Sequence, residues 1–266
     1  MIFDVITIFP DIFKSFLAES LLAKAIEKNI LEVRFTNPRD FAADRHHTAD
    51  DRPYGGGPGM VMKPEPLAAA IEAASARGAG RPRRIYLSPS GRRLTQEKVE
   101  ELSGLGRLIL VCGRYEGLDQ RVIDLFIDEE ISIGDYVVNG GEAPAMVLIE
   151  ATARLLPGFM GKMESAAEES HQSGLLEYPH YTRPPEFRGL GVPERLLSGD
   201  HKDVARWRLA AALARTLRER PEMLAKAGVS PEALKILPHL YRAEAAAAGR
   251  PAAAKNAAKR SVAKKS

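Results

Sequence analysis

The feature that most constrains the fold is a regular alternation between short apolar segments and segments with helical periodicity over the first 157 residues. The expected strands cover residues 1–9, 32–35, 84–87, 108–112 and 130–133, and the expected helical stretches cover 10–22, 66–76, 95–102, 118–126 and 143–156. Strands that alternate with helices form a mainly parallel sheet covered on both faces. We therefore predict an α/β domain, in which Thr95 is a plausible N-cap.

The alternation ends in a stretch rich in glycine, serine and glutamate. We expect an α/β domain at residues 1–157, a linker at 158–173, a small helical domain at 174–244 and a disordered tail at 245–266. Helical periodicity covers residues 201–220 and 231–247 in the second half. The tail holds six basic residues and no acidic one, so it could add weak attraction for phosphate groups.

Charge, cysteine content and hydropathy exclude several classes of protein. The net charge of the chain is +3. Without the tail, 32 basic and 35 acidic residues give residues 1–244 a net charge of −3. Any RNA binding by this part therefore depends on local basic patches. The single cysteine, Cys112, excludes an internal disulfide and a cysteine-based zinc cluster, and its apolar neighbours predict a packing role. Since no segment resembles a signal peptide or a membrane span, we expect a soluble, cytoplasmic protein.

Three loops that follow expected strands combine glycine with tyrosine or serine. They cover residues 86–91 (YLSPSG), 112–117 (CGRYEG) and 132–141 (SIGDYVVNGG). Ligands of open parallel sheets bind beyond the C-terminal ends of the strands, and glycine lets the backbone approach a ligand closely. Each loop alone could be an ordinary turn between a strand and a helix. The three together favour a site in which backbone groups contact a nucleoside.

Nucleotide-binding motifs of other classes are absent from the sequence. No G-x-G-x-x-G follows the first strand, and no G-x-x-x-x-G-K-[ST] occurs anywhere. The glycine run at residues 55–59 (GGGPG) lies in a long aperiodic segment, 37–64, but Met60 and Val61 follow it where a P-loop has a lysine and a hydroxyl. We predict a functional loop that could act as a mobile lid.

Four strings resemble the bacterial tRNA (guanine-N1)-methyltransferase family, TrmD, of the SPOUT superfamily. They are residues 51–60 (DRPYGGGPGM), 113–117 (GRYEG), 132–136 (SIGDY) and 181–184 (YTRP). The resemblance implies a SPOUT-type α/β domain with a deep trefoil knot, and a homodimer whose active site lies between subunits. It also implies methyl transfer from S-adenosylmethionine to N1 of the tRNA guanosine 3′-adjacent to the anticodon (position 37), with residues 174–244 binding the tRNA.

The resemblance places the methyl donor in the three glycine-containing loops. The residues that it assigns to this site are Tyr86, Leu87, Ser88, Pro89, Gly113, Tyr115, Glu116, Gly117, Ser132, Ile133, Gly134, Asp135, Tyr136, Val137, Val138, Gly140, Gly141 and Pro144. Glu116 lies within this set and could face either the donor or the RNA.

Methylation at guanine N1 requires that the N1 proton be removed, and a nearby carboxylate can act as the general base. Ser165 and Glu168 have the spacing of a capping box, which leaves Glu169 as the candidate base. The family usually has aspartate at this position, so the extra methylene is a departure. Arg154 matches the family arginine on the guanine O6 side, where it could stabilise negative charge. Without the resemblance, Glu169 is a solvated charge and Arg154 a helix-surface partner of Glu150.

By resemblance, the RNA-side candidates are Asp50, Arg52, Arg114, His180 and Arg183, each of which could equally belong to a polar loop surface. We assign no metal ligands, because the adjacent His46 and His47 cannot easily face one site. The methyl group needs no metal for its activation, although Mg²⁺ could act on the nucleophile.

Two other functions stay open at this point. A catalytically silent RNA-binding protein on the same scaffold would account for the glutamate at position 169. A knotted methyltransferase acting on ribose 2′-hydroxyl groups or on ribosomal RNA is the other alternative, although the loop at 51–60 and the helical domain count against it.

Overall fold

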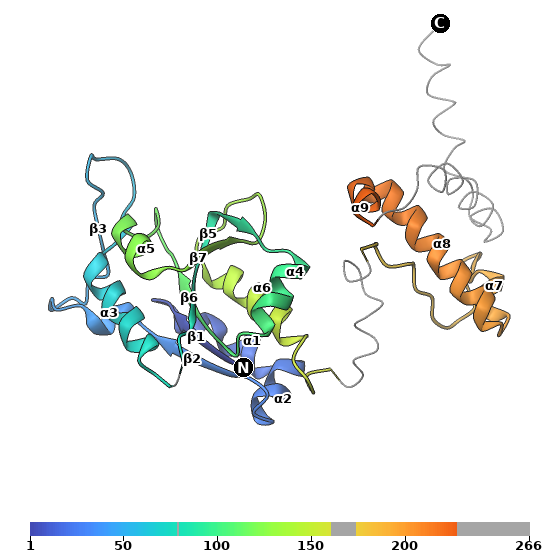
Figure 1. Cartoon of the computed structure of the whole chain (residues 1–266), viewed down its shortest axis with the longest axis horizontal. Helices are drawn as coiled ribbons and strands as arrows, with labels where there is room; N and C mark the ends of the chain where they lie inside the picture. The colour runs from blue at the N-terminus through green and yellow to red at the C-terminus, as the bar shows by residue number, and fades with distance from the viewer. Residues whose placement is uncertain (79, 161–173, 228–266) are drawn as a thin grey trace, which may run out of the picture. The chain divides into compact units, whose positions relative to one another are not determined.

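A computed structural model describes residues 1–78, 80–160 and 174–227 of the 266-residue chain (Figure 1). The chain divides into two compact units, Met1–Gly161 and Lys162–Ser266, which are described one at a time. The division falls inside the stretch predicted as a linker. The predicted helix at 231–247, the tail and most of the linker lie outside the described residues.

The first unit is built on a five-stranded sheet whose order is β2-β1-β6-β5-β7 and whose neighbouring strands are all parallel. The strands are β1 (Ile2–Ile6), β2 (Glu32–Thr36), β5 (Arg83–Arg93), β6 (Arg107–Cys112) and β7 (Glu129–Ser132). The central strand β6 is buried at every position, which explains its nearly continuous apolar run. The predicted parallel α/β sheet is confirmed.

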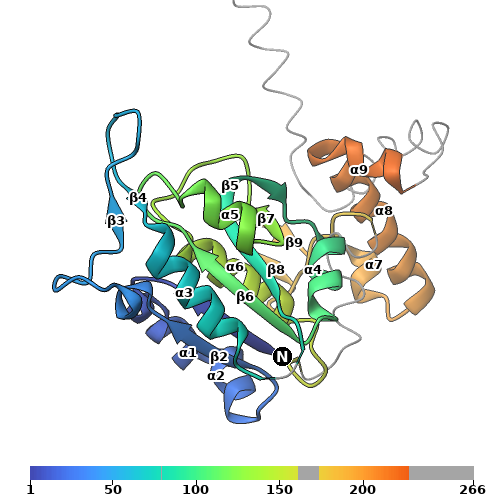
Figure 2. The ribbon, with the colours of Figure 1, turned by 60° about the vertical axis from the view of Figure 1, so that its left-hand side comes forward.

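Helices cover both faces of the sheet (Figures 1 and 2). One face carries η1 (Pro10–Phe13), α1 (Lys14–Ala18), α2 (Ser20–Glu27), α4 (Gln96–Ser103) and α6 (Glu142–Ala153), and the other carries α3 (Pro64–Ser75) and α5 (Gln120–Phe126). Leu108 and Leu110 of β6 pack in the hydrophobic core under α2, α4 and α6, whereas Ile109 and Val111 pack in the core under α3 and α5. This alternation follows from the two-residue period of a strand.

Two expectations about helices have different outcomes. The continuous helical stretch expected at residues 10–22 is wrong, because the segment divides into η1, α1 and α2. Glu19 is extended and Ser20 adopts a positive φ of 59°, which ends a right-handed helix. The expected N-cap of α4 is confirmed, since the Thr95 hydroxyl accepts the Lys98 N–H at 3.3 Å.

The aperiodic segment at 37–64 contains little regular structure. It begins with η2 (Pro38–Phe41) and includes the short strands β3 (Asp50–Asp51) and β4 (Val61–Met62), which pair antiparallel with Asp50 opposite Met62. The glycine run at 55–59 is therefore an exposed connection between two paired strands. Its two ends are held together although the run itself is open to solvent.

The second unit contains the strands β8 (Glu186–Phe187) and β9 (Leu190–Gly191) and the helices α7 (Glu194–Leu197), α8 (His201–Glu219) and α9 (Pro221–Lys226). Helix α8 corresponds to the helix predicted at 201–220. Its Trp207 is buried and lies edge-on against Tyr181, with ring centroids 6.2 Å apart. Over the described ranges, no helix is both long and apolar enough to cross a bilayer.

Candidate functional site

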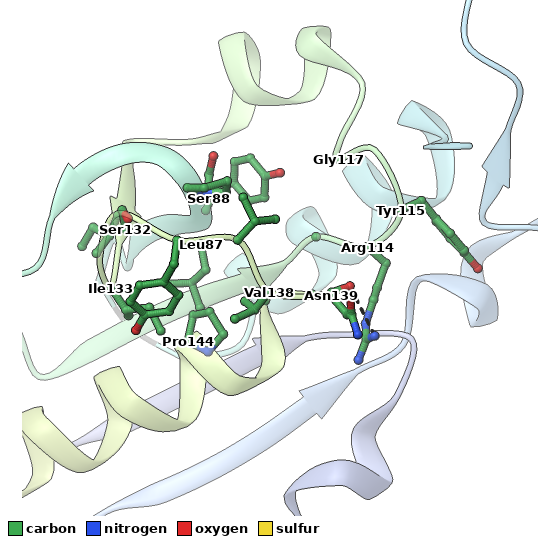
Figure 3. A pocket seen from close by; sticks show the side chains of 18 of the residues that line it. Leu87, Ser88, Arg114, Tyr115, Gly117, Ser132, Ile133, Val138, Asn139 and Pro144 are labelled. Atoms are coloured by element: carbon green, nitrogen blue, oxygen red, sulfur yellow. Dashed lines mark hydrogen bonds between the residues drawn. The ribbon is translucent and has the colours of Figure 1, made fainter. Parts of the chain in front are cut away.

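The three glycine-containing loops meet in one pocket of about 230 Å³, which lies where β6 and β7 end and beside the middle of β5 (Figure 3). Every residue that the resemblance assigned to the methyl donor lines this pocket, except Gly134 and Asp135. The lining also includes Arg114, Ile131 and Asn139. The resemblance did not assign these three residues to the methyl donor, although Arg114 and Asn139 lie in the predicted loops. Arg114 was expected on the RNA side, and the other two had no distinguishing pattern.

Gly134 and Asp135 shape the third loop from outside the lining. The Asp135 carboxylate forms an ion pair with Arg93. The Gly134 carbonyl accepts hydrogen bonds from the Ser132 hydroxyl and from the Tyr136 N–H, both at 2.9 Å. These contacts fold residues 132–136 into a compact turn, so both residues act on the pocket through their neighbours.

The first loop is an excursion within β5. Leu87 and Arg92 both pair with Ile131 of β7, so the four residues between them leave the ladder and then return to it. Ser88 and Pro89 lie in this excursion and line the pocket. A Cβ on Gly91 would lie 2.5 Å from the Glu130 backbone carbon, so the return to the sheet requires glycine.

The second loop follows β6 and presents its backbone to the pocket. A Cβ on Gly113 would lie 2.8 Å from the Tyr86 ring, so this glycine allows the loop to pack on the ring. Burial is the main cause that raises the pKa of the Tyr86 hydroxyl, with a smaller effect from Glu130. Tyr115 has a positive φ of 58°, and its half-exposed side chain points away from Leu87 and Val138 (Figure 3). Its contribution to the pocket is therefore made mainly by the backbone.

The third loop supplies apolar walls and backbone donors. Side chains of Leu87, Ile133, Val138 and Pro144 gather around the pocket (Figure 3). The N–H groups of Val137 and Val138 have no backbone acceptor within the described part of the chain. Apolar walls can enclose a flat heterocycle while free N–H groups bind its polar edge. The pocket thus has the walls and the donors to bind a flat heterocycle with a polar edge.

The exposed glycine run is tied to this pocket. The Met60 carbonyl accepts the Glu116 N–H at 2.9 Å, and the Met62 N–H donates to the Gly117 carbonyl at 2.9 Å. A Cβ on Gly59 would lie 2.3 Å from a Glu116 carboxylate oxygen. The end of the predicted lid is therefore packed directly on the second loop.

Buried polar groups lie below the pocket at the start of α6. Glu142 is 1% exposed and forms an ion pair with Arg114, and Cys112 is buried next to them. Burial and then the charge of Glu142 raise the pKa of the Cys112 thiol well above its usual value. The predicted packing role of Cys112 is confirmed. Sequence reasoning missed Glu142, because an acidic residue in the first turn of a helix is ordinary.

The remaining predicted residues lie on several elements. Arg154 is exposed at the C-terminal end of α6, Asp50 lies in β3, and Arg52 follows β3. Glu169, the predicted base, lies outside the described residues. The part of the chain covered by the structure contains no group of three or more potential metal ligands.

His180 and Arg183 belong to the second unit. The His180 ring lies 2.8 Å from the Glu177 carboxylate, and its centroid is 4.9 Å from that of Tyr178, with the two ring planes tilted by 49°. The guanidinium of Arg208, on α8, lies over the same Tyr178 ring, 5.0 Å from its centroid. Arg183 is exposed. The rings of Tyr178 and His180 and the guanidinium of Arg208 thus lie together within this unit.

Comparison with known proteins agrees with this architecture. A family model described as tRNA (Guanine-1)-methyltransferase TrmD matches residues 1–226. Similar proteins named tRNA (guanine-N(1)-)-methyltransferase include one from Geotalea uraniireducens, 53% identical over 91% of this chain and 98% of its own length. Others come from Actinobacillus succinogenes, 52% identical over 89% of this chain and 97% of its own, and Pasteurella multocida, 50% identical over the same shares. The chain therefore belongs to the TrmD family of tRNA (guanine-N1)-methyltransferases.

Proposed function

We propose that this protein is an S-adenosylmethionine-dependent tRNA (guanine-N1)-methyltransferase that modifies the guanosine 3′-adjacent to the anticodon. The observation that carries this proposal is the convergence of the three glycine-containing loops in one pocket of a chain that belongs to the TrmD family. Neither the family model nor the similar proteins give support to a catalytically silent RNA-binding protein.

The pocket would hold the adenosine part of the donor. Leu87, Ile133 and Val138 would pack on the adenine ring, while the Val137 and Val138 N–H groups would donate to its edge. When bound, the donor supplies a methyl group on a positively charged sulfur, which loses its charge on transfer. The protein's own part is to hold that methyl group in line with guanine N1.

Transfer also requires removal of the N1 proton, and we assign this step to Glu169. A general base of this kind contributes typically about 10²–10⁴-fold to the rate. Arg154 would donate to the guanine O6 side and stabilise the negative charge that develops as N1 loses its proton. No step in this scheme requires a metal at the methyl group.

The RNA side of the proposal uses residues from both units. Asp50, Arg52 and Arg114 would contact the RNA from the first unit, and His180 and Arg183 from the second, with the arginines able to pair with phosphate. We further propose a cytoplasmic homodimer with the trefoil knot of SPOUT proteins. This part of the proposal rests on membership of the TrmD family.

The test is methyl transfer from labelled S-adenosylmethionine to unmodified tRNA, followed by nucleoside analysis and mapping by mass spectrometry. The expected product is 1-methylguanosine next to the anticodon. Replacement of Glu169 by alanine should lower turnover by about 10²–10⁴-fold without a matching loss of donor affinity. Absence of any transfer would support the silent alternative, and a methylated ribose or ribosomal RNA would support the third one. Either result would refute the proposal.

A further inference from the structure

A chain of buried polar contacts runs beneath the pocket and joins three distant segments. The Phe9 N–H donates to the Thr7 hydroxyl at 2.9 Å, and this hydroxyl donates to Glu142 Oε1 at 2.7 Å. The second carboxylate oxygen, Oε2, lies 2.9 Å from Arg114 Nε. Thr7 is fully buried and Glu142 is 1% exposed. These contacts connect the end of β1, the start of α6 and the loop after β6.

The energetics of burial make Arg114 dependent on this carboxylate. The Glu142 side chain is 2% exposed and that of Arg114 is 20% exposed, so a charge without its partner would lie in a poorly solvated position. The Nε and Oε2 atoms are close but not aligned as a hydrogen bond, so the contact is electrostatic. Removal of either charge leaves the other uncompensated.

Arg114 in turn holds two walls of the pocket together. Its backbone forms an isolated bridge with Gly140, and its Nη1 donates to the Asn139 carbonyl at 3.4 Å. A Cβ on Gly140 would lie 2.4 Å from Arg114 Nε, so the loop packs directly on the guanidinium. The guanidinium also stacks 4.7 Å above the Phe9 ring. Its position therefore determines how the second and third loops meet.

We propose that Glu142 and Thr7 are positioning residues for methyl-donor binding, which act by holding Arg114 between the second and third loops. This inference rests on the proposed function, because it assigns the donor to the same pocket. Thr7 does not line the pocket, and its hydroxyl bonds to Glu142 and to the Phe9 N–H. Both of these residues contact Arg114, so we expect the effect of the hydroxyl on donor affinity to pass through Arg114. Arg114 thereby serves the pocket structure in addition to any contact with RNA.

Thr7 offers the sharpest variants. Thr7→Val removes the hydroxyl and nearly preserves the shape, whereas Thr7→Ser keeps the hydroxyl. Thr152→Val is a matched control, because Thr152 is also fully buried but its hydroxyl has no hydrogen-bond partner. Glu142→Gln tests the charge itself, since it presents an amide to the guanidinium.

The measurement is the Kd of S-adenosylmethionine by calorimetry on the full chain, well below the melting temperature of each variant. We expect Thr7→Val to raise the Kd at least about threefold, because it removes one buried hydrogen bond. We expect Glu142→Gln to raise it about 10–100-fold, because it removes the charge that compensates Arg114. Thr7→Ser should restore wild-type affinity, and Thr152→Val should leave it unchanged. The KM for tRNA should change less than the KM for the donor.

Two results would overturn the inference. One is a donor affinity in Thr7→Val equal to that of the wild type. This result decides the question even if Glu142→Gln fails to fold. The other is an equal loss in Thr152→Val, which would indicate general softening of the core. Donor binding by the wild-type protein tests the proposed function, and failure of the unmodified chain to bind the donor would refute it. The ratio of variant to wild-type affinity tests only the positioning role. The two failures are therefore distinguishable.

Discussion

Alanine substitutions at Gly141 and Gly104 separate the cost of a steric clash beside the pocket from the cost of a changed backbone conformation. Gly141, before α6, has φ −76° and ψ −7°, and Gly104, after α4, has φ −80° and ψ −10°. Both conformations suit alanine equally well. However, a Cβ on Gly141 would lie 2.6 Å from the Cys112 Cα, whereas a Cβ on Gly104 would meet nothing closer than a carbonyl oxygen at 3.5 Å.

The expected difference follows from these distances. Carbon atoms in contact normally lie about 3.5–4.0 Å apart, so Gly141→Ala must separate β6 from the start of α6 by about 1 Å. Overpacking of this kind costs about 1–3 kcal/mol, which lowers the melting temperature by about 2–12 °C for a protein of this size. Gly104→Ala should instead be neutral or stabilise the fold by up to about 1 kcal/mol, because alanine restricts the unfolded chain.

Thermal unfolding followed by circular dichroism measures the change in melting temperature. Calorimetry with S-adenosylmethionine measures the change in donor affinity. Gly141→Ala should also weaken donor binding, since Gly141 lines the pocket and its N–H donates to the Gly113 carbonyl at 2.9 Å. Equal melting temperatures for the two variants, within about 1 °C, would refute the close approach of β6 and α6 on which the site depends.

Three further predictions concern the loop, the sheet edge and the ligand. Gly59→Ala should destabilise the fold by at least about 1 kcal/mol and reduce tRNA methylation, because φ is +86° and the Glu116 side chain occupies the position of the new Cβ. Gly56→Ala has a similar φ of +79° but open space around it, so it should have only the cost of the backbone conformation and destabilise less. Urea unfolding of both variants measures the difference. Asp128 has its pKa lowered to about 2, since hydrogen bonds from Arg84 outweigh the opposing effect of burial. Its contribution of about 2 kcal/mol is present above pH 4 and lost as pH falls towards 2, so Asp128→Asn should flatten this part of the pH profile of unfolding. S-adenosylmethionine at 100 times its Kd should stabilise the fold by about 2.7 kcal/mol, and an unchanged melting temperature would contradict binding to the native pocket.

The sheet and the location of the pocket could be predicted from sequence because strand periodicity and glycine placement are local signals. The apolar run at Leu108–Val111 predicts a strand buried on both faces, and the structure confirms it. Helix boundaries around Ser20 were wrong, since its positive φ leaves no mark in the residue pattern. The excursion of β5 was also missed, because pairing of Leu87 and Arg92 with the same residue depends on β7, about 40 residues later in the chain.

The buried support of the pocket could not be read from the sequence. Thr7 lies in an apolar strand and Glu142 begins a helix, and 135 residues separate them. They meet because β1 and α6 pack in the same hydrophobic core. The roles of Arg154 and Glu169 stay predictions that rest on the resemblance.

The attachment of Met60 and Met62 to the second loop has a thermodynamic consequence. Since the Glu116 N–H and the Gly117 carbonyl are shared between the pocket and the segment that ends the glycine run, a ligand that reorders residues 115–117 also shifts the conformational ensemble of residues 55–59. Coupling between two such sites is reciprocal: if RNA binding favours one arrangement of the glycine run, the affinity of each substrate changes by the same factor when the other is bound. The strength of the coupling between the two substrates would then depend on two main-chain hydrogen bonds.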